Sequence, residues 1–180
     1  MPFTRELFIE REDFMEVPPK GYHRLYIGNE IRLKTAYYVK ATSCEKDESG
    51  KVTVVHCTYD PESRGGETPD GRKVKGTSHW VSAKYAISGE VRLYDKLFNA
   101  EYPGGDTGNY LDDLNPESLV IVNDAKMEPA VAEAKPGDYL QFIRSGYFTP
   151  DYDSTPEHLV FNRTVTLKDS WAKQKAKMGL

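Results

Sequence analysis

Three kinds of feature are scarce in this sequence of 180 residues: cysteines, long apolar runs and metal-binding clusters. Its two cysteines, Cys44 and Cys57, have no CxxC or Cys/His grouping around them, so we expect reduced thiols rather than a disulfide or a metal site. No segment approaches the roughly 18 apolar residues of a membrane span, and the N-terminus lacks a basic region followed by an apolar run. These absences predict a cytoplasmic protein with no membrane partner.

Motifs of catalysis are missing as well. The stretch GRKVKGTS, residues 71–78, has glycines at 71 and 76 but puts Thr77 where a phosphate-binding loop needs a lysine. No serine lies in a nucleophile-elbow context, and no two histidines have the HxxxH or HxH spacing of metal ligands. The sequence therefore argues against a self-contained enzyme and directs attention to binding.

What the sequence does contain is the pattern of a β protein. Residues 29–42 alternate apolar and polar positions, and a turn leads from them into 52–60, which is rich in β-branched and aromatic residues, so this pair predicts a hairpin. Proline- and glycine-rich turns separate the further strand candidates, which are 73–83, 91–94, 118–123, 138–148 and 159–167. Helical turns are expected at 11–16, at 93–98 and after Leu167. Many short strands at short spacing are typical of barrels and sandwiches, so we expect an all-β fold with a few short helices.

Charge is distributed unevenly along the chain. The formal net charge is −4, which does not suggest a general nucleic-acid binder. Residues 17–42, however, carry five basic side chains against one acidic, and 71–96 carry six against two, so each segment has a local charge of +4. Residues 101–119 hold five carboxylates and no lysine or arginine. Such segregation permits a polyanion-binding face on an acidic molecule.

Five ordered stretches carry a resemblance to a known family: TRELFIEREDF, GRKVKGTSHWVSA, VRLYDKLF, NPESLVIV and VFNRTVTLKDSWAK. Together they resemble the C-terminal anticodon-binding region of glutaminyl-tRNA synthetase over essentially the whole chain. The resemblance implies two packed β-barrels, with a distal barrel at 19–98 inserted into an incomplete proximal barrel made of 1–18 and 99–180. It also implies a parent enzyme that is an ATP-dependent glutamine–tRNA ligase, a class I aminoacyl-tRNA synthetase.

The ATP-binding signatures of such a parent, of HIGH-like and KMSKS-like type, do not occur in this chain. We therefore expect a recognition module that is inactive alone and holds no cofactor, while ATP and Mg belong to the parent. The partners that the resemblance implies are the anticodon loop of the tRNA for glutamine and an upstream catalytic domain of the same polypeptide. Because the first strands of the proximal barrel would lie upstream of Met1, an uncovered strand edge is expected to promote self-association.

The resemblance also assigns anticodon-binding residues in the first half of the chain. In the segment KGYHRL it places Arg24 on a base-reading arginine, with Lys20 and His23 beside it, and in IRLK it places Arg32 and Lys34 on two further positions. Three positions depart from the family pattern: Gly21 replaces a glutamine, His23 a lysine and Lys34 an arginine. Lysine keeps the charge but loses the planar fork, so the role of Lys34 shifts towards a phosphate or a single acceptor.

In the second half, the segment LQFIRSGYF places Gln141 and Arg144 on the pair that meets the centre of the anticodon. An amide supplies both a donor and an acceptor to a uridine edge. Aromatic rings can stack on unstacked bases, and the candidates are Tyr22, Tyr37, Tyr38 and Tyr147, of which at least two are expected in the core. The basic stretch at 71–78 is expected to flank the site or support the barrel, and His79 and Trp80 to pack within it.

Three other interpretations stay open from the sequence. The first is the anticodon-binding domain of an archaeal or eukaryotic-type glutamyl-tRNA synthetase, which shares the two-barrel plan. The second, from a different class, is a ribosomal-RNA-binding β-barrel, although such a protein is expected to be more basic and to lack the KDSW ending. The third is a small enzyme with a concealed pocket, which the absence of a nucleophile, base and orienting group disfavours.

Overall fold

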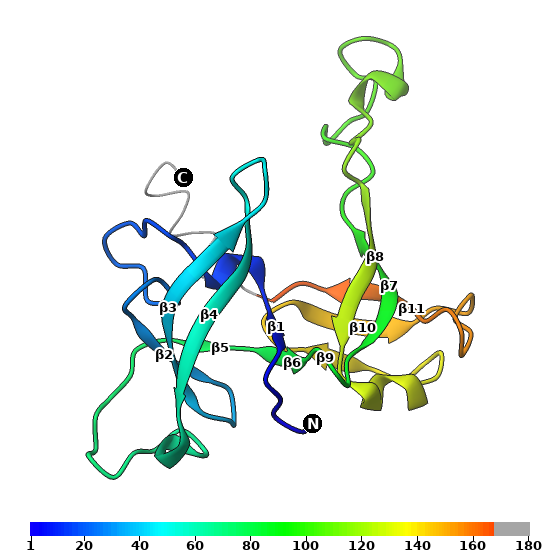
Figure 1. Ribbon diagram of the computed structural model, residues 1–180. Helices are drawn as coiled ribbons and strands as arrows, with labels where there is room; N and C mark the ends of the chain where they lie inside the picture. Colours follow the sequence, from blue (N-terminus) through cyan, green and yellow to red (C-terminus); the bar gives the residue numbers. More distant parts are fainter. Residues whose placement is uncertain (168–180) are drawn as a thin grey trace. The chain divides into compact units, whose positions relative to one another are not determined.

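The computed structural model describes residues 1–167, and the chain divides into two compact units, Met1–Tyr85 and Ala86–Leu180 (Figure 1). Strands dominate both units, which confirms the expected all-β fold with a few short helices. The short helices are single turns of 3₁₀ type: η1 Arg11–Asp13, η2 Pro61–Ser63, η3 Tyr110–Asp113 and η4 Pro129–Glu133. The helical turn expected after Leu167 lies outside the described residues.

Unit 1 contains a four-stranded sheet in the order β4-β3-β2-β5 and a separate two-stranded sheet, β1-β6. The strands are β1 Leu7–Ile9, β2 Glu30–Leu33, β3 Tyr38–Lys46, β4 Val52–Asp60, β5 Thr77–Ser78 and β6 Trp80–Ser82. The long hairpin β3–β4 confirms the predicted hairpin for the second half of 29–42, whereas the first half is not continuous with it: the chain turns at 34–37, and β2 pairs with β3. Its turn is held by Asp47, whose carboxylate accepts hydrogen bonds from the backbone N–H of Ser49 at 2.9 Å and of Lys51 at 3.0 Å.

The core of unit 1 explains how its sheet presents polar side chains. Along β2, Ile31 and Leu33 are buried and pack with Leu25 and Trp80, while Glu30 and Arg32 are only partly covered. Because successive side chains of a strand point to opposite faces, burial of Ile31 and Leu33 turns Glu30 and Arg32 outward.

Unit 2 is built on a five-stranded sheet in the order β8-β7-β11-β10-β9. The strands are β7 Ile87–Tyr94, β8 Leu119–Met127, β9 Leu140–Phe142, β10 Gly146–Pro150 and β11 Val160–Val165. Strands β11 and β7 are parallel, and the other neighbours are antiparallel. The core residues Val91, Met127, Phe148 and Phe161 lie together at the centre of this unit.

Two expectations about local structure and closure need correction. The helical turn expected at 93–98 is wrong, because Leu93 and Tyr94 belong to β7 and pair with Val120 and Leu119 of β8. The helical turn at 11–16 is present only as η1. Within residues 1–167 no sheet closes into a barrel, since each sheet has two free edges.

The compact units do not coincide with the segments assigned to the two expected barrels. Strand β1, from segment 1–18, pairs with β6 inside unit 1, and β7, from segment 19–98, pairs with β8 and β11 inside unit 2. The division into a distal barrel at 19–98 and a proximal barrel at 1–18 and 99–180 stays a prediction. In the part of the chain that the structure describes, no helix has the length and apolar character needed to cross a membrane.

Candidate nucleic-acid interface

Arg24 lies just before β2 and is tied to the segment around η1. The backbone N–H of Leu25 donates to the carbonyl of Asp13 at 2.8 Å, which brings the two segments together. Nη1 of Arg24 lies 3.0 Å from Oδ1 of Asp13 and 3.7 Å from Oε2 of Glu12. The contact with Oδ1 is an ion pair by distance and not an aligned hydrogen bond. Since the Asp13 side chain is completely buried and that of Arg24 is 18% exposed, this guanidinium supports the fold of unit 1.

Arg32 and Lys34 present their charges differently. Nε of Arg32 donates a long hydrogen bond of 3.4 Å to Oγ1 of Thr77, and its stem covers Gly66, where an added Cβ would lie 2.6 Å from Cδ of Arg32. Lys34 is exposed, and its backbone is fixed because its carbonyl accepts a hydrogen bond of 3.0 Å from Nε1 of Trp80. Among the residues described, neither Arg32 nor Lys34 forms an ion pair, so both cations are available to a ligand.

The segment that contains Lys20 and His23 meets the start of β5. Both side chains are exposed. A Cβ at Gly76 would lie 1.9 Å from the carbonyl oxygen of His23, so only glycine fits where these two segments cross. The carbonyl of Gly76 in turn accepts a hydrogen bond of 3.2 Å from the backbone N–H of Arg32. His23 and Arg32 therefore lie on either side of Gly76, in one neighbourhood of unit 1.

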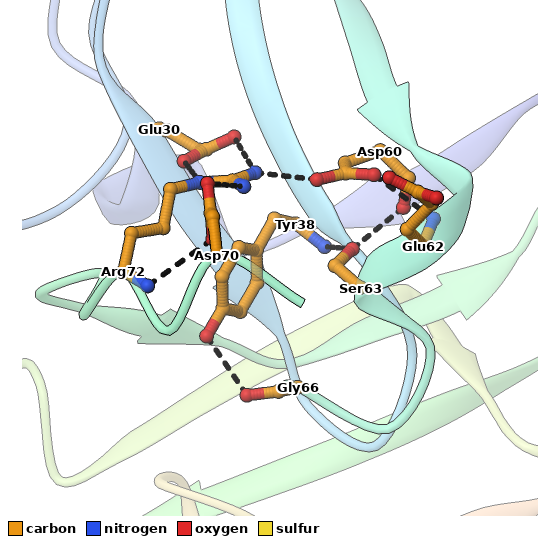
Figure 2. Close-up of polar contacts among 8 residues, drawn as sticks. All are labelled: Glu30, Tyr38, Asp60, Glu62, Ser63, Gly66, Asp70 and Arg72. Carbon is orange, nitrogen blue, oxygen red and sulfur yellow. Dashed lines mark hydrogen bonds and ion pairs between the residues drawn. The ribbon is translucent and has the colours of Figure 1, made fainter. Parts of the chain in front are cut away.

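Arg72, in the basic stretch at 71–78, is a structural hub (Figure 2). Its Nε and Nη2 donate to the two carboxylate oxygens of Glu30 at 3.0 and 3.1 Å, and Nη1 donates to Oδ2 of Asp70 at 2.8 Å. Nη2 also donates to Asp60, and the guanidinium lies 5.4 Å from the centre of the Tyr38 ring. Hydrogen bonds to Glu30 and then to the two aspartates raise the pKa of Arg72, and its contact with Asp60 lowers the pKa of that carboxyl. Arg72 therefore fixes its loop to β2 and β4, as expected for a supporting role.

The loop that Arg72 holds is anchored at a second place, also shown in Figure 2. The backbone N–H of Tyr38 donates to Oγ of Ser63 at 2.7 Å, and the Tyr38 hydroxyl donates to the carbonyl of Gly66 at 2.8 Å. Trp80 is buried in the core of unit 1, which confirms its expected packing role. Lys73 and Lys75 remain exposed and flank the neighbourhood of Gly76.

The other predicted residues lie on the β9–β10 hairpin of unit 2. Gln141 in β9 is exposed, and Arg144 occupies the three-residue turn, where the backbone N–H of Ser145 donates to the carbonyl of Phe142 at 2.9 Å. Arg144 has φ of 70°, a left-handed conformation that costs a non-glycine residue roughly 1 to 2 kcal/mol. On the opposite face the rings of Phe142 and Phe148 stack with centroids 4.4 Å apart. The hairpin thus has one apolar face and one polar face.

Arg163 of β11 is not among the site residues predicted from the sequence. Within residues 1–167 its buried Nε has no hydrogen-bond partner, and its Cδ lies 3.2 Å from where a Cβ of Gly146 would be. Because buried donors are normally hydrogen-bonded, a water or a ligand oxygen would complete the bonding of this Nε. No local sequence motif marks this position, because its surroundings depend on the pairing of β11 with β10.

Two family models match the chain, and both are described as "tRNA synthetases class I (E and Q), anti-codon binding domain". One covers residues 1–60 and the other covers 77–151. The chain therefore belongs to the anticodon-binding domains of the class I (E and Q) tRNA synthetases.

Its similar proteins carry the name glutamine–tRNA ligase, which confirms the resemblance to the glutaminyl enzyme. The chain is 52% identical over 175 residues to that of Bradyrhizobium diazoefficiens, which is 97% of this chain and 31% of the relative. It is 53% identical over 174 residues to that of Vibrio cholerae, which is 96% of this chain and 31% of the relative. It is 54% identical over 175 residues to that of Cupriavidus metallidurans, which is 96% of this chain and 30% of the relative. The chain thus spans about a third of the length of these relatives.

Proposed function

We propose that this chain reads the anticodon loop of the tRNA for glutamine. The observation that carries the proposal is the polar face of the β9–β10 hairpin, where Gln141 and Arg144 are both exposed in a chain whose relatives are glutamine–tRNA ligases. RNA loops are recognised through bases that are splayed out and bound at their edges by planar donors and amides. A short, well-packed hairpin offers such groups with little freedom to lose on binding.

Within unit 1, the contacts support different roles for the cations that the sequence singled out. Arg32, Lys34, Lys20 and His23 would meet the RNA backbone or a base edge, since their side chains are turned outward or exposed. Arg24 would act mainly by holding its segment in place through Asp13. This assignment departs from the base-reading role that the family resemblance gives to Arg24.

We also propose that the chain acts as the recognition part of a longer ligase. The relatives are about three times as long and are named for the ligation of glutamine to tRNA, so activation of glutamine with ATP and Mg would reside in a catalytic domain outside this chain. The chain alone would bind tRNA without charging it, and the whole protein would work in the cytoplasm. An aminoacylation assay with the chain as the sole protein would test this directly, because any transfer of labelled glutamine to tRNA contradicts the proposal.

An exposed edge strand supports the proposed self-association of the isolated chain. Within residues 1–167, β8 pairs with β7 alone, and its segment from Leu119 to Val122 is between 40% and 46% exposed at every residue. Exposure of apolar residues on both faces of an edge strand invites pairing with another chain. Light scattering should show concentration-dependent dimers that the substitution Ile121→Lys removes, and a monodisperse monomer over a wide concentration range would overturn this point.

Binding of labelled anticodon stem-loops tests the main proposal. Three loops are compared at two salt concentrations: one with CUG, one with UUC and one scrambled. Selective binding of CUG is expected, whereas preference for UUC would favour the glutamyl alternative. Equal binding of all three that vanishes with salt would leave only a basic patch and contradict anticodon reading by this chain.

The variant Arg144→Gly sharpens this experiment. Glycine removes the guanidinium and also relieves the left-handed strain at this position, so loss of binding cannot be attributed to a strained turn. If Arg144 reads a base, binding of the CUG loop should weaken by about 1 to 3 kcal/mol. The matched control is Lys135→Ala, which removes one exposed positive charge from the same unit and should leave the preference for CUG unchanged.

A further inference from the structure

We infer that Tyr147 is the stacking platform for the anticodon base whose edge Gln141 binds. The inference rests on the proposed function and adds to it a residue that recognises the face of the base rather than its edge. Stacking on an aromatic ring is tolerant of sequence, so this residue would supply affinity while Gln141 supplies discrimination.

The other aromatic candidates are held within the fold of unit 1. Tyr22 and Tyr38 are only 5% and 4% exposed, and their hydroxyls donate to the carbonyls of Glu12 and Gly66. Tyr37 packs in an aromatic cluster, with its ring centroid 4.9 Å from that of Phe3. Tyr147, by contrast, is 41% exposed. Of the four tyrosines, Tyr147 alone is exposed. Its strand, β10, also pairs with β9, which carries the predicted site residue Gln141.

The register of the sheet places Tyr147 directly beside Gln141. The two are Cα partners in the antiparallel pair of β9 and β10, so their side chains project from the same face with Cβ atoms about 4.5 to 5.5 Å apart. On its other side Tyr147 is the Cα partner of Val165 in β11, which is also exposed. An amide, an aromatic ring and an aliphatic side chain therefore form one row across three strands. That row suits a planar ligand with a polar edge and an apolar face.

The backbone beneath this row is fixed before any ligand arrives. A Cβ at Gly146 would lie 2.6 Å from the carbonyl oxygen of Val165, so the strands approach here as closely as only glycine permits. Oγ1 of Thr164 donates to the carbonyl of Tyr147 at 3.1 Å. Opposite Tyr147 and Phe148, strand β11 carries one extra residue, Thr164, between their partners Val165 and Arg163. Because successive side chains of a strand point to opposite faces, Tyr147 is turned outward while Phe148, the next residue, is buried in the core.

The experiment measures binding of the CUG stem-loop to Tyr147→Ala and Tyr147→Phe. The phenyl ring should bind as tyrosine does, because stacking needs the ring and not the hydroxyl. Alanine should weaken binding by about 5- to 150-fold, the equivalent of roughly 1 to 3 kcal/mol at 1.4 kcal/mol per tenfold change. The control is Tyr152→Ala, which removes a tyrosine that is 90% exposed in the same unit and should leave affinity unchanged. Thermal unfolding of each variant monitors the fold.

Stem-loops with a single abasic nucleotide identify the stacked base. If Tyr147 stacks on the base bound by Gln141, then Tyr147→Ala and Gln141→Ala each lose their effect when the same anticodon position is abasic, and keep it when either other position is abasic. Coupling of the two variants to different positions would overturn the inference. So would full affinity of Tyr147→Ala for a loop that Arg144→Gly fails to bind, which would leave the proposed function standing. Absence of selective binding by the unmodified chain would remove the proposed function and the inference together.

Discussion

Replacing Arg24 with alanine asks whether this arginine holds unit 1 together or reads a base. Its Nη1 lies 3.0 Å from Oδ1 of Asp13, whose side chain is completely buried. Breaking a buried ion pair by removing one partner costs about 3 to 5 kcal/mol, because the remaining charge stays in a site built for its counterion. Since 18% of the Arg24 side chain is exposed, water can reach the site and we expect the lower value, about 3 kcal/mol. With a urea dependence of about 1.5 kcal/mol per molar, the unfolding midpoint should fall by about 2 M.

Unit 1 has its own reporter for this measurement. Trp80 is buried in its core, and the substitution Trp171→Phe leaves Trp80 as the sole tryptophan of the chain. Urea unfolding followed by tryptophan fluorescence then reports on unit 1. The double variant Asp13→Leu with Arg24→Met removes both charges, and it should recover most of the lost stability because apolar replacement of a whole buried pair is often neutral.

The opposite result would refute the structural role. If Arg24→Ala unfolds at the same urea concentration as the unmodified chain but loses selective binding of the CUG loop, the guanidinium acts on RNA and its contact with Asp13 contributes little. If the variant is destabilised yet binds CUG with unchanged affinity at low temperature, Arg24 supports the fold alone. The two measurements together therefore assign the residue.

Three further predictions concern the hub and the second core. Arg72→Gln should release the loop at 61–76, and trypsin should then cleave after Arg64 faster than in the unmodified chain, whereas an unchanged cleavage rate would contradict the hub. Arg72 lowers the pKa of Asp60, so this pair stabilises the fold above the ordinary carboxyl pKa near 4, and the stabilisation is lost as the pH falls through the lowered value. Thermal melts between about pH 2 and 5 should therefore show a smaller loss of stability on acidification in Arg72→Gln than in the unmodified chain. Parallel curves would count against this linkage. Phe148→Ala should destabilise unit 2 by about 3 to 5 kcal/mol in urea unfolding monitored by circular dichroism, and a loss under about 1 kcal/mol would show that Phe148 is not a core residue.

Much of the fold was predictable wherever a strand could be recognised from its own residues. The hairpin of β3 and β4 followed from alternation and from a turn rich in polar residues. The sequence predicted both a strand at 91–94 and a helical turn at 93–98, and the strand prevails because Leu93 and Tyr94 pair with Val120 and Leu119 across a long loop. Such a distant partner leaves no mark on local propensity. The same limit applies to closure, since whether edge strands meet is decided by segments far apart in the chain.

The sequence predicted which residues belong to the candidate site better than it predicted what each residue does there. The resemblance pointed to Arg24, but its ion pair with Asp13 depends on how the chain turns between η1 and β2. The pairing of Gln141 with Tyr147 could have been predicted from the sequence. A turn centred on Arg144 places residues three before and three after it opposite one another, which is the register observed. Alternation along β10 places Tyr147 and Phe148 on opposite faces, but which of the two is exposed depends on how the sheet packs around the core of unit 2, and that could not be predicted.

The contacts also change how the local charge of the sequence is interpreted. In the segment at 71–96, Arg72 is bound by three carboxylates, and Arg92 lies 2.6 Å from Glu90 and 3.2 Å from both Asp151 and Asp153. Neither arginine presents a net positive charge to a ligand, although both contribute to the +4 counted along the chain.

The same contacts increase the net positive charge that the segment at 17–42 presents to a ligand. Its single acidic residue, Glu30, is bound through both carboxylate oxygens to Arg72 of the other segment, so it is already neutralised when a ligand approaches Arg32 on the same strand. Lys20, Arg32 and Lys34, together with the exposed Lys40, Lys73 and Lys75, therefore supply positive charge to unit 1 of a protein with a net charge of −4. A salt bridge between two outwardly basic segments thus concentrates the available charge beside Gly76.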